Sequence, residues 1–235
     1  MKAGGLLGQA LLVTLTDVSQ EDVRDFNQWY NREHIDDLLN VAGFRRARRY
    51  AGEAMKPRFM ALYEVEDIDV LTSPAYFELL ANQSAWSRKI IGRFTYHRRL
   101  CATVTVDFAR GLGGAVGIIR LPVPPDIVRV RELLSETGFP EVIDRCGMHG
   151  ALLAECDLDA VNAPITQLGL TLPAATEPEC LVILEGEDTK STTAAIDHLV
   201  AQLRAILSKD HCLLTGSYSL LYANQRSFRN NQAGS

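Results

Sequence analysis

Tyr30 and His34 are the residues of this sequence whose types and spacing best suit catalysis. With Val23 as the origin of a helical wheel at about 100° per residue, Phe26, Asn27, Tyr30 and His34 fall within roughly 60° of it. A helix buries such a stripe against a sheet, and residues four apart can touch. An imidazole with an ordinary pKa near 6.5 can move protons or hydrogen-bond a ligand carbonyl. We therefore predict Tyr30 and His34 as a catalytic pair; the alternative is a helix-end histidine bonded to backbone.

Four arginines lie on the strand predicted over residues 44–50, Phe-Arg-Arg-Ala-Arg-Arg-Tyr. Alternation along a strand places two of them on each face. Burying an unpaired guanidinium is costly, so each one needs an acidic partner, solvent or an anionic ligand. One interpretation is an edge strand kept from aggregating by its charge. The other is a carboxylate-binding arginine, for which Arg46 and Arg49 are the candidates.

Aromatic residues and one further histidine supply the other candidates for substrate binding. Trp29 lies about 100° from the buried stripe, so we expect it to pack against a loop or a neighbouring subunit. Tyr63 lies within a predicted strand, Trp86 on a predicted helix and His97 at a strand start. Residues of these types in such positions belong more often to a core or a rim than to a catalytic site.

The composition is that of an ordinary globular protein. The chain has 235 residues, 47% hydrophobic and 23% charged, with a formal net charge of −5. This charge gives no basic footprint for nucleic acid, and the longest apolar runs are far shorter than a membrane span. We read a cytoplasmic protein without a cleavable signal. Its five cysteines are scattered and include no C-x-x-C pair, so we expect no disulfide framework and no metal site.

The predicted elements follow the order β-α-β-β-α-β twice, and this repetition determines the expected fold. The first set covers 9–16, 20–39, 44–50, 58–65, 73–91 (with a break near 82–84) and 96–108. The second covers 115–121, 126–137, 146–156, 179–185, 189–207 and 213–222. Each set is a ferredoxin-like unit whose four-stranded sheet leaves one face uncovered. The two sheets can cover each other, which predicts an α+β fold in which two tandem ferredoxin-like repeats form a pseudo-dimeric α+β barrel.

The repeat sets the expected domain limits. The glycine-rich segment 111–114 separates a first repeat, 1–110, which we expect to be the active half, from a structural second repeat, 111–223. Residues 224–235 are predicted to form a flexible tail. A weak echo of 61–67 in 182–188 supports the duplication. The insert 157–178 is expected to be a long loop that covers a site or an oligomer surface.

The second repeat does not contain a pair equivalent to Tyr30 and His34 under either of two alignments of the repeats. Matching Ile127 to Val23 places Leu134 on Tyr30 and Gly138 on His34. Matching the two Gly-Phe pairs, at 43–44 and 138–139, instead places Arg129 on His34. Only the first repeat is therefore expected to be chemically equipped.

The residues Trp29-Tyr30, Glu33-His34, Gly43-Phe44 and Arg49-Tyr50 form a pattern over roughly residues 10–100. This pattern resembles the dimeric α+β barrel superfamily, in particular its EthD-like members. The resemblance implies a cleft between helices and sheet that takes flat, ring-shaped ligands, with a histidine or tyrosine that handles protons. The superfamily includes isomerases, polyketide cyclases, cofactor-free monooxygenases and heme-degrading enzymes.

Three functions remain open at this stage. The first is a cofactor-independent isomerase, cyclase or dehydratase of aromatic catabolism that acts on a small aromatic, lactone or polyketide-like carboxylate. The second is a protein that binds or degrades heme or another hydrophobic ligand, with His34 or His97 on the iron. The third is a non-catalytic barrel module. No dinucleotide, P-loop, H-E-x-x-H or G-x-S-x-G motif is present, so we expect no cofactor. A homodimer of the two-repeat chain is left open.

Overall fold

The computed structural model describes residues 5–169, 174–208 and 211–226, and it divides them into two similar halves. The first half comprises β1 (Ala10–Val18), α1 (Val23–Trp29), η1 (Tyr30–His34), α2 (Ile35–Asn40), β2 (Phe44–Ala51), β3 (Phe59–Val65), η2 (Ile68–Thr72), α3 (Pro74–Ala81), α4 (Ala85–Ile91) and β4 (Phe94–Asp107). The second comprises β5 (Ala115–Pro122), α5 (Ile127–Leu133), η3 (Leu134–Gly138), α6 (Phe139–Cys146), β6 (Gly150–Cys156), α7 (Leu158–Leu168), β7 (Glu179–Gly186), α8 (Thr189–Ile206) and β8 (Leu214–Gln225).

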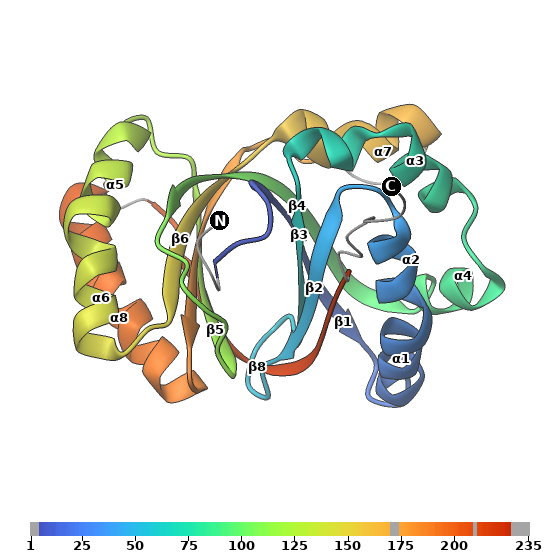
Figure 1. The fold of residues 1–235 in the computed structure, drawn as a ribbon, viewed down its shortest axis with the longest axis horizontal. Coiled ribbons are helices and arrows are strands. Elements are labelled where there is room, and N and C mark those ends of the chain that lie inside the picture. Colours follow the sequence, from blue (N-terminus) through green and yellow to red (C-terminus); the bar gives the residue numbers. More distant parts are fainter. Residues whose placement is uncertain (1–4, 170–173, 209–210, 227–235) are drawn as a thin grey trace, which may run out of the picture.

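The strands form one closed antiparallel barrel, in the order β1-β3-β2-β8-β5-β7-β6-β4. Each half supplies four neighbouring strands, and the pairs β2–β8 and β4–β6 join the halves. Helices α1–α4 cover the outside of the first half, and α5, α6 and α8 cover the second (Figure 1). The predicted α+β barrel of two tandem ferredoxin-like repeats is confirmed. Because the barrel is closed, every strand in it has a hydrogen-bonded neighbour on both sides, and none is an edge strand.

The interpretation of β2 as an edge strand is wrong. It pairs with β3 on one side and with β8 on the other, so it is not an edge. Arg48 forms an ion pair with Glu185 on β7, which is not a neighbour of β2 in the barrel, so this pair crosses the barrel interior. The alternating position, Arg49, lies on the opposite face, beneath the helices. The strand therefore separates its arginines between two environments.

The interior arginines belong to a buried network of four charges. Glu64 accepts hydrogen bonds from Arg46 Nε and Nη2, both at 2.8 Å, and from Arg48 Nη2 at 3.0 Å. Arg48 also pairs with Glu185. Arg46 thus has a carboxylate partner within the protein, so its charge does not require an anionic ligand, and its role in substrate binding stays a prediction. Glu64 and Glu185 occupy equivalent positions in the sequence echo, and both contact Arg48.

The helix predicted over 20–39 is interrupted. A π-helical turn, η1, separates α1 from α2 and contains both Tyr30 and His34. The second half has η3 at the same position between α5 and α6, with Leu134 in the place of Tyr30 and Gly138 in the place of His34. The first of the two registers considered for the repeat is therefore the structural one. π-turns inside α-helices occur frequently at functional sites.

Two other expectations are settled by the described elements. The break predicted near 82–84 is confirmed, because Ser84 caps the start of α4 through its side chain. The insert 157–178, predicted as a long loop, contains helix α7, capped by Asp157. In Figure 1, α7 lies beside α3, on the side of the first half. Strand β8 continues to Gln225, so it includes the first two residues of the predicted tail, 224 and 225, and the tail from 227 lies outside the described residues.

None of the helices in the described part of the chain combines the length and hydrophobicity of a membrane span.

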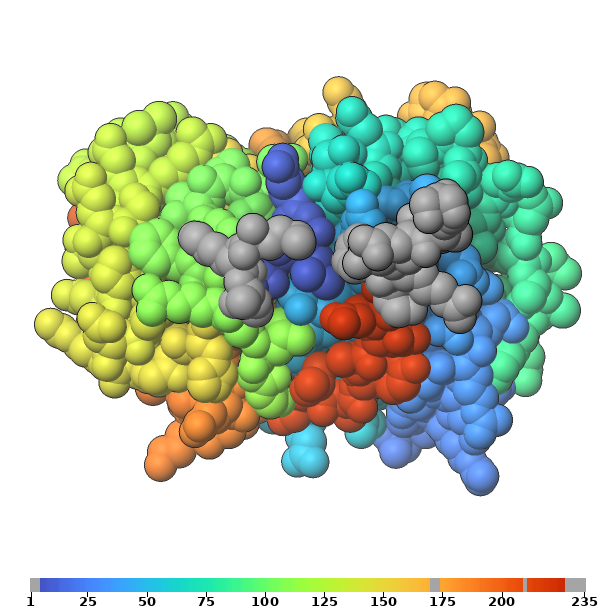
Figure 2. All heavy atoms as spheres, viewed as in Figure 1, coloured from blue at the N-terminus to red at the C-terminus, as the bar shows by residue number. Residues whose placement is uncertain are grey.

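Gly8 and Gly113 lie at equivalent points of the two halves, where the chain passes close to the end of a strand. A methyl group on Gly8 would lie 1.8 Å from the Val65 carbonyl oxygen, and one on Gly113 would lie 1.9 Å from the Gly186 carbonyl oxygen. In Figure 2 the N-terminal residues, in blue, lie between the two halves. Both segments therefore approach a strand end so closely that only glycine fits.

Gly113→Ala is expected to lower the free energy of unfolding by about 1–3 kcal/mol, the usual cost of overpacking. Urea unfolding would measure it. Gly111→Ala is the matched control, because no atom lies within 4 Å of its new methyl group. If both variants had the same free energy of unfolding, the prediction would be wrong, because the strand end at Gly186 would then accommodate the methyl group without loss of stability.

Candidate functional site

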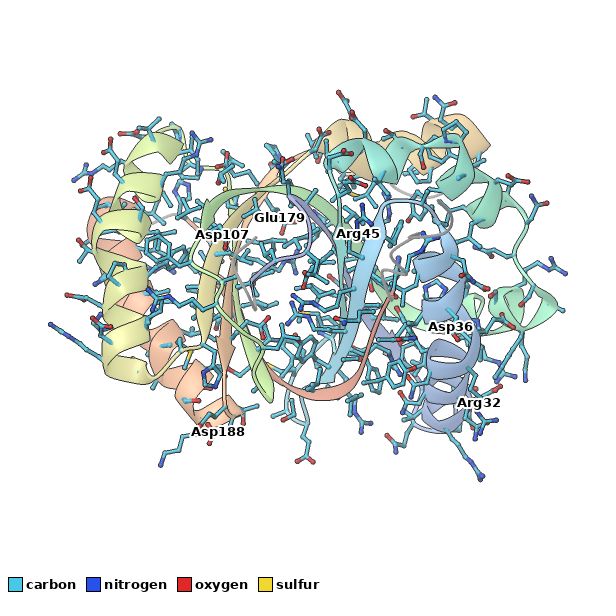
Figure 3. The ribbon with its side chains drawn as sticks, in the orientation of Figure 1. Arg32, Asp36, Arg45, Asp107, Glu179 and Asp188 are labelled. Atoms are coloured by element: carbon cyan, nitrogen blue, oxygen red, sulfur yellow. The ribbon has the colours of Figure 1, made fainter. Side chains whose placement is uncertain are left out.

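The candidate site lies on the outer face of the first-half sheet, beneath η1. Register places Arg49, Ala61, Thr14 and Arg99 in one row across β2, β3, β1 and β4. Tyr63 lies in the adjacent row. Because Ala61 and Thr14 are small, the middle of the row leaves room for the Tyr30 and His34 rings, which belong to η1. Arg32 and Asp36 are exposed on the other side of this helical segment (Figure 3).

Arg49 is a buried cation without a carboxylate partner in the described residues. It is 1% exposed. Its Nη1 donates to Asn31 Oδ1 at 2.7 Å, and its Nη2 donates to Asn27 Oδ1 at 2.8 Å. The guanidinium carbon lies 4.1 Å from the centre of the Tyr30 ring. Burial lowers the pKa of Arg49, because nothing negative compensates its charge. An anionic ligand would supply the missing charge.

His34 is held in place by aromatic rings. Its ring stacks on Trp29 at 4.4 Å and meets Tyr30 edge-on at 4.9 Å. Neither ring nitrogen makes a hydrogen bond within the described residues, so the alternative of a backbone-bonded helix end is wrong. Burial lowers the pKa of His34 to about 3, and the positive charge of Arg49 contributes. The imidazole is therefore neutral at physiological pH, with one nitrogen able to donate and the other able to accept.

The pH dependence of stability should reveal this neutral His34. In the unfolded chain it binds a proton near pH 6.5, and in the folded chain only near pH 3. Between these values the unfolded state binds more protons, so the free energy of unfolding falls as the pH is lowered. The expected slope is up to about 1.4 kcal/mol per pH unit. Urea unfolding at about pH 7 and about pH 5 measures it, and His34→Gln should remove this contribution. A His34 NMR signal that titrates near pH 6.5 would contradict the assignment.

Two tyrosine hydroxyls complete the polar part of the site. The Tyr63 hydroxyl is buried and has no hydrogen-bond partner in the described residues. Burial raises the pKa of Tyr63 well above its ordinary value, and the nearby Tyr30 adds to this shift, so the phenol stays protonated. The Tyr30 hydroxyl lies 3.3 Å from Thr14 Oγ1. Tyr63 is therefore a buried donor that a ligand oxygen could satisfy.

The other predicted residues are only partly brought together. Trp29 is buried, and its indole nitrogen donates to Ser87 Oγ on α4 at 2.9 Å, so it packs on a helix of its own chain. The indole nitrogen of Trp86 donates to Asp25 on α1, which makes Trp86 a link between two helices. His97 is exposed, lies 3.3 Å from Thr16 Oγ1 and stacks on Phe94 at 5.3 Å. Its effect on the pKa of His34 places it near the imidazole.

Sequence reasoning missed the role of the two asparagines and Arg99. Asn27 was recognised on the helical stripe, but nothing indicated that it and Asn31 would hold Arg49. Arg99 Nη1 donates to the carbonyls of Ala160 and Val161, both at 2.9 Å, while its Nε and Nη2 are buried without partners. The available signal was the alternation of side chains along the strand. Arg99 is two residues from the buried Cys101, so both side chains lie on the same face of the sheet.

The equivalent place in the second half is closed. A methyl group on Gly138 would lie 2.9 Å from Leu199 and 3.2 Å from Leu134, so helix α8 fills the position that corresponds to His34. The assignment of the second repeat as the structural half stays a prediction. In the first half, the hollow beside Arg49 and Tyr30 has no room for a water molecule. A ligand would reach Arg49 only if the Tyr30 ring or η1 moved.

Comparisons with known proteins relate this chain to others by fold alone. No protein-family model matches it, and no curated protein matches it in sequence. A candidate monooxygenase from Lactobacillus acidophilus is 8% identical, with a TM-score of 0.54 over 93% of this chain and 96% of the other. An anthrone oxidase-like protein is 10% identical, with a TM-score of 0.52 over 92% of each chain. A candidate chlorite dismutase is 10% identical, with a TM-score of 0.51 over 92% of this chain and 96% of the other. The barrel fold is therefore shared, and the EthD-like pattern stays a resemblance.

Proposed function

We propose that this protein binds a small, flat, hydrophobic organic anion between η1 and the first-half sheet. The observation that carries the proposal is Arg49, a guanidinium that is 1% exposed and that contacts, among the described residues, two neutral amides and the rings of Phe26 and Tyr30 but no carboxylate. A buried charge without a counter-charge is costly, and an anionic ligand would remove that cost. The ring-shaped ligand that the family resemblance implies would find aromatic neighbours there, namely Phe26, Trp29 and Tyr30.

His34 and Tyr63 define how such a ligand would be oriented. The neutral imidazole and the unpartnered phenol offer hydrogen bonds to ligand oxygens, while Trp29 and Tyr30 offer ring faces. A histidine whose pKa lies near 3 is a weak base. This favours hydrogen bonding over the proton abstraction that an isomerase, cyclase or dehydratase would require, and the comparisons give those three reactions no support.

A heme on His34 would require a larger rearrangement of this site than a small ring ligand. The imidazole is covered on one face by Trp29 at 4.4 Å, and Tyr30 and Tyr63 meet it edge-on at 4.9 and 6.5 Å. Either ligand needs the Tyr30 ring or η1 to move, and a macrocycle, being larger, would displace more of these rings. The residues of this site therefore favour the smaller ligand.

A second candidate function is oxidation of the bound anion by molecular oxygen. The unpaired charge of Arg49 favours it, because a nearby cation stabilises the phenolate or enolate form that reacts with oxygen. The names of two structurally similar proteins, a candidate monooxygenase and an anthrone oxidase-like protein, are consistent with it. An oxygen electrode would detect consumption with any ligand found to bind; no consumption would leave binding as the function.

Matched pairs of anionic and neutral ligands test the binding proposal. Calorimetric titrations of the full chain with 2-naphthoate and with 2-naphthamide would measure the two affinities. The carboxylate is expected to bind at least about tenfold more tightly, since a hydrogen bond to a charged group contributes about 1.5–3 kcal/mol. Equal affinities, or no saturable binding of either, would overturn the proposal. Hemin is titrated alongside, and a Soret shift that His34→Ala abolishes would favour heme instead.

A further inference from the structure

Arg99 on β4 is a second guanidinium without a carboxylate partner in the described residues. Its Nη1 donates to the carbonyls of Ala160 and Val161 on α7, both at 2.9 Å. Pro164, within α7, has no amide proton for the Ala160 carbonyl, so Arg99 supplies that donor. The Nε and Nη2 atoms of Arg99 are buried and have no hydrogen-bond partner among the residues that the structure describes. One nitrogen therefore fixes the guanidinium, and its Nε–Nη2 edge has no partner.

The Nε–Nη2 edge is the one through which other arginines of this protein hold carboxylates. Its two parallel N–H groups match the two oxygens of a carboxylate. Three arginines in the described part of the chain use both nitrogens in this way, each on one glutamate: Arg46 on Glu64, Arg120 on Glu179 and Arg131 on Glu155. Arg99 has the same edge buried but no glutamate or aspartate on it, so it can receive the carboxylate of a ligand.

The groups around Arg99 do not compensate its charge. The guanidinium carbon lies 5.6 Å from the centre of the Tyr76 ring on α3. Burial lowers the pKa of Arg99, but Tyr76 and Cys101 together raise it above its ordinary value, and no carboxylate contributes to this shift. Asp157 lies at the start of α7, where its Oδ1 accepts from the Ala160 amide at 2.9 Å and caps the helix. It forms no ion pair with Arg99, whose charge is therefore left without a counter-charge in the described residues.

Arg99 and Arg49 lie at the two ends of one row on the outer face of the first-half sheet. Only Ala61 on β3 and Thr14 on β1 lie between them in this row, and both are small. Three strand spacings separate the two arginine Cα atoms by about 14 Å. The Tyr30 hydroxyl lies 3.3 Å from Thr14 Oγ1, so a movement of Tyr30 that admits a ligand to Arg49 would also uncover the middle of the row.

We propose that the ligand of the Arg49 site is a flat aromatic diacid, with one acidic group bound by Arg49 and the other by the Nε–Nη2 edge of Arg99. This inference rests on the proposed function and names the class of ligand for that site. The amides of Asn27 and Asn31 position Arg49, and the α7 carbonyls position Arg99, so neither cation depends on the ligand for its orientation. A monoacid compensates one of the two charges, whereas a diacid compensates both.

Naphthalene-2,6-dicarboxylate and 6-carbamoyl-2-naphthoate are the probes, because they differ only in whether the second group is charged. Calorimetry on the full chain should show the diacid binding at least about tenfold more tightly than the carbamoyl compound. Arg99→Met should remove this difference. Arg98→Met is the matched control, because it removes the same charge from the neighbouring residue of β4, which faces the other side of the sheet and pairs with Glu179. The control should keep the preference for the diacid.

Equal affinities of the unmodified chain for the two probes would overturn this inference, and that comparison stands even if Arg99→Met fails to fold. A preference for the diacid that survived in Arg99→Met would overturn it as well. Asn27→Asp should weaken the diacid, and an undiminished affinity there would show that the ligand does not reach Arg49. 2-Naphthoate separates the two proposals: if it binds but the diacid has no advantage, only the second acidic group is wrong, whereas no binding of any of the three acids would overturn both.

Discussion

Replacing Glu64 with leucine is expected to lower the free energy of unfolding by about 3–5 kcal/mol. The carboxylate is fully buried, and it binds Arg46 through both oxygens and Arg48 through one. It also accepts the Leu7 backbone amide at 2.9 Å. Without it, Arg46 is left as a buried charge that has only the Gly5 carbonyl as an acceptor, while Arg48 keeps Glu185. Urea unfolding followed by far-UV circular dichroism would measure the loss.

Glu66→Gln is the matched control for this prediction. Glu66 is only two residues away and also pairs with an arginine, Arg45, but its side chain is 57% exposed. Exposed pairs contribute about 0–1 kcal/mol, so the control should stay within about 1 kcal/mol of the unmodified chain. Simultaneous replacement of all four network residues by apolar ones of similar size should recover most of the loss. A Glu64→Leu chain as stable as the control would contradict the buried network.

Replacing Asn27 with aspartate is expected to weaken binding of an anionic ring ligand by about ten- to hundredfold. The change keeps the shape of the side chain and the oxygen that lies 2.8 Å from Arg49 Nη2, but it adds a negative charge. Arg49 then has a carboxylate partner within the protein, so its charge no longer requires a ligand. The affinity for 2-naphthoate, measured by calorimetry, should fall, whereas that for the neutral amide should not.

Asn40→Asp separates this effect from a simple change in net charge. Asn40 is exposed at the end of α2, so a carboxylate there leaves the Arg49 site intact. Its affinity for 2-naphthoate should match that of the unmodified chain. Arg49→Met should reproduce the loss seen in Asn27→Asp, although it leaves the Asn27 and Asn31 oxygens without their donor. If Asn27→Asp kept full affinity, Arg49 would not be the anion-binding group.

The order of elements and the doubling of the fold follow from the sequence alone. The apolar runs of β1 and β5, the glycines at 111–114 and the repeated β-α-β-β-α-β order are local features, and local features determine which elements form. The sequence also identified Tyr30 and His34 as neighbours on one helical face. The structure keeps them together, 4.9 Å between ring centres, although a π-turn replaces the regular helix there.

The tertiary structure alone decided what each of these side chains can do. Arg46, Arg48 and Arg49 are nearly contiguous in sequence, yet two of them meet Glu64 inside the barrel and the third meets two asparagines beneath η1. These glutamate and asparagine partners lie 16 or more residues away in the sequence, so no local pattern encodes the difference. The same holds for His34, whose pKa of about 3 is a property of its burial near Arg49. Sequence determines which groups are present, whereas long-range packing determines their charge, their partners and therefore their chemistry.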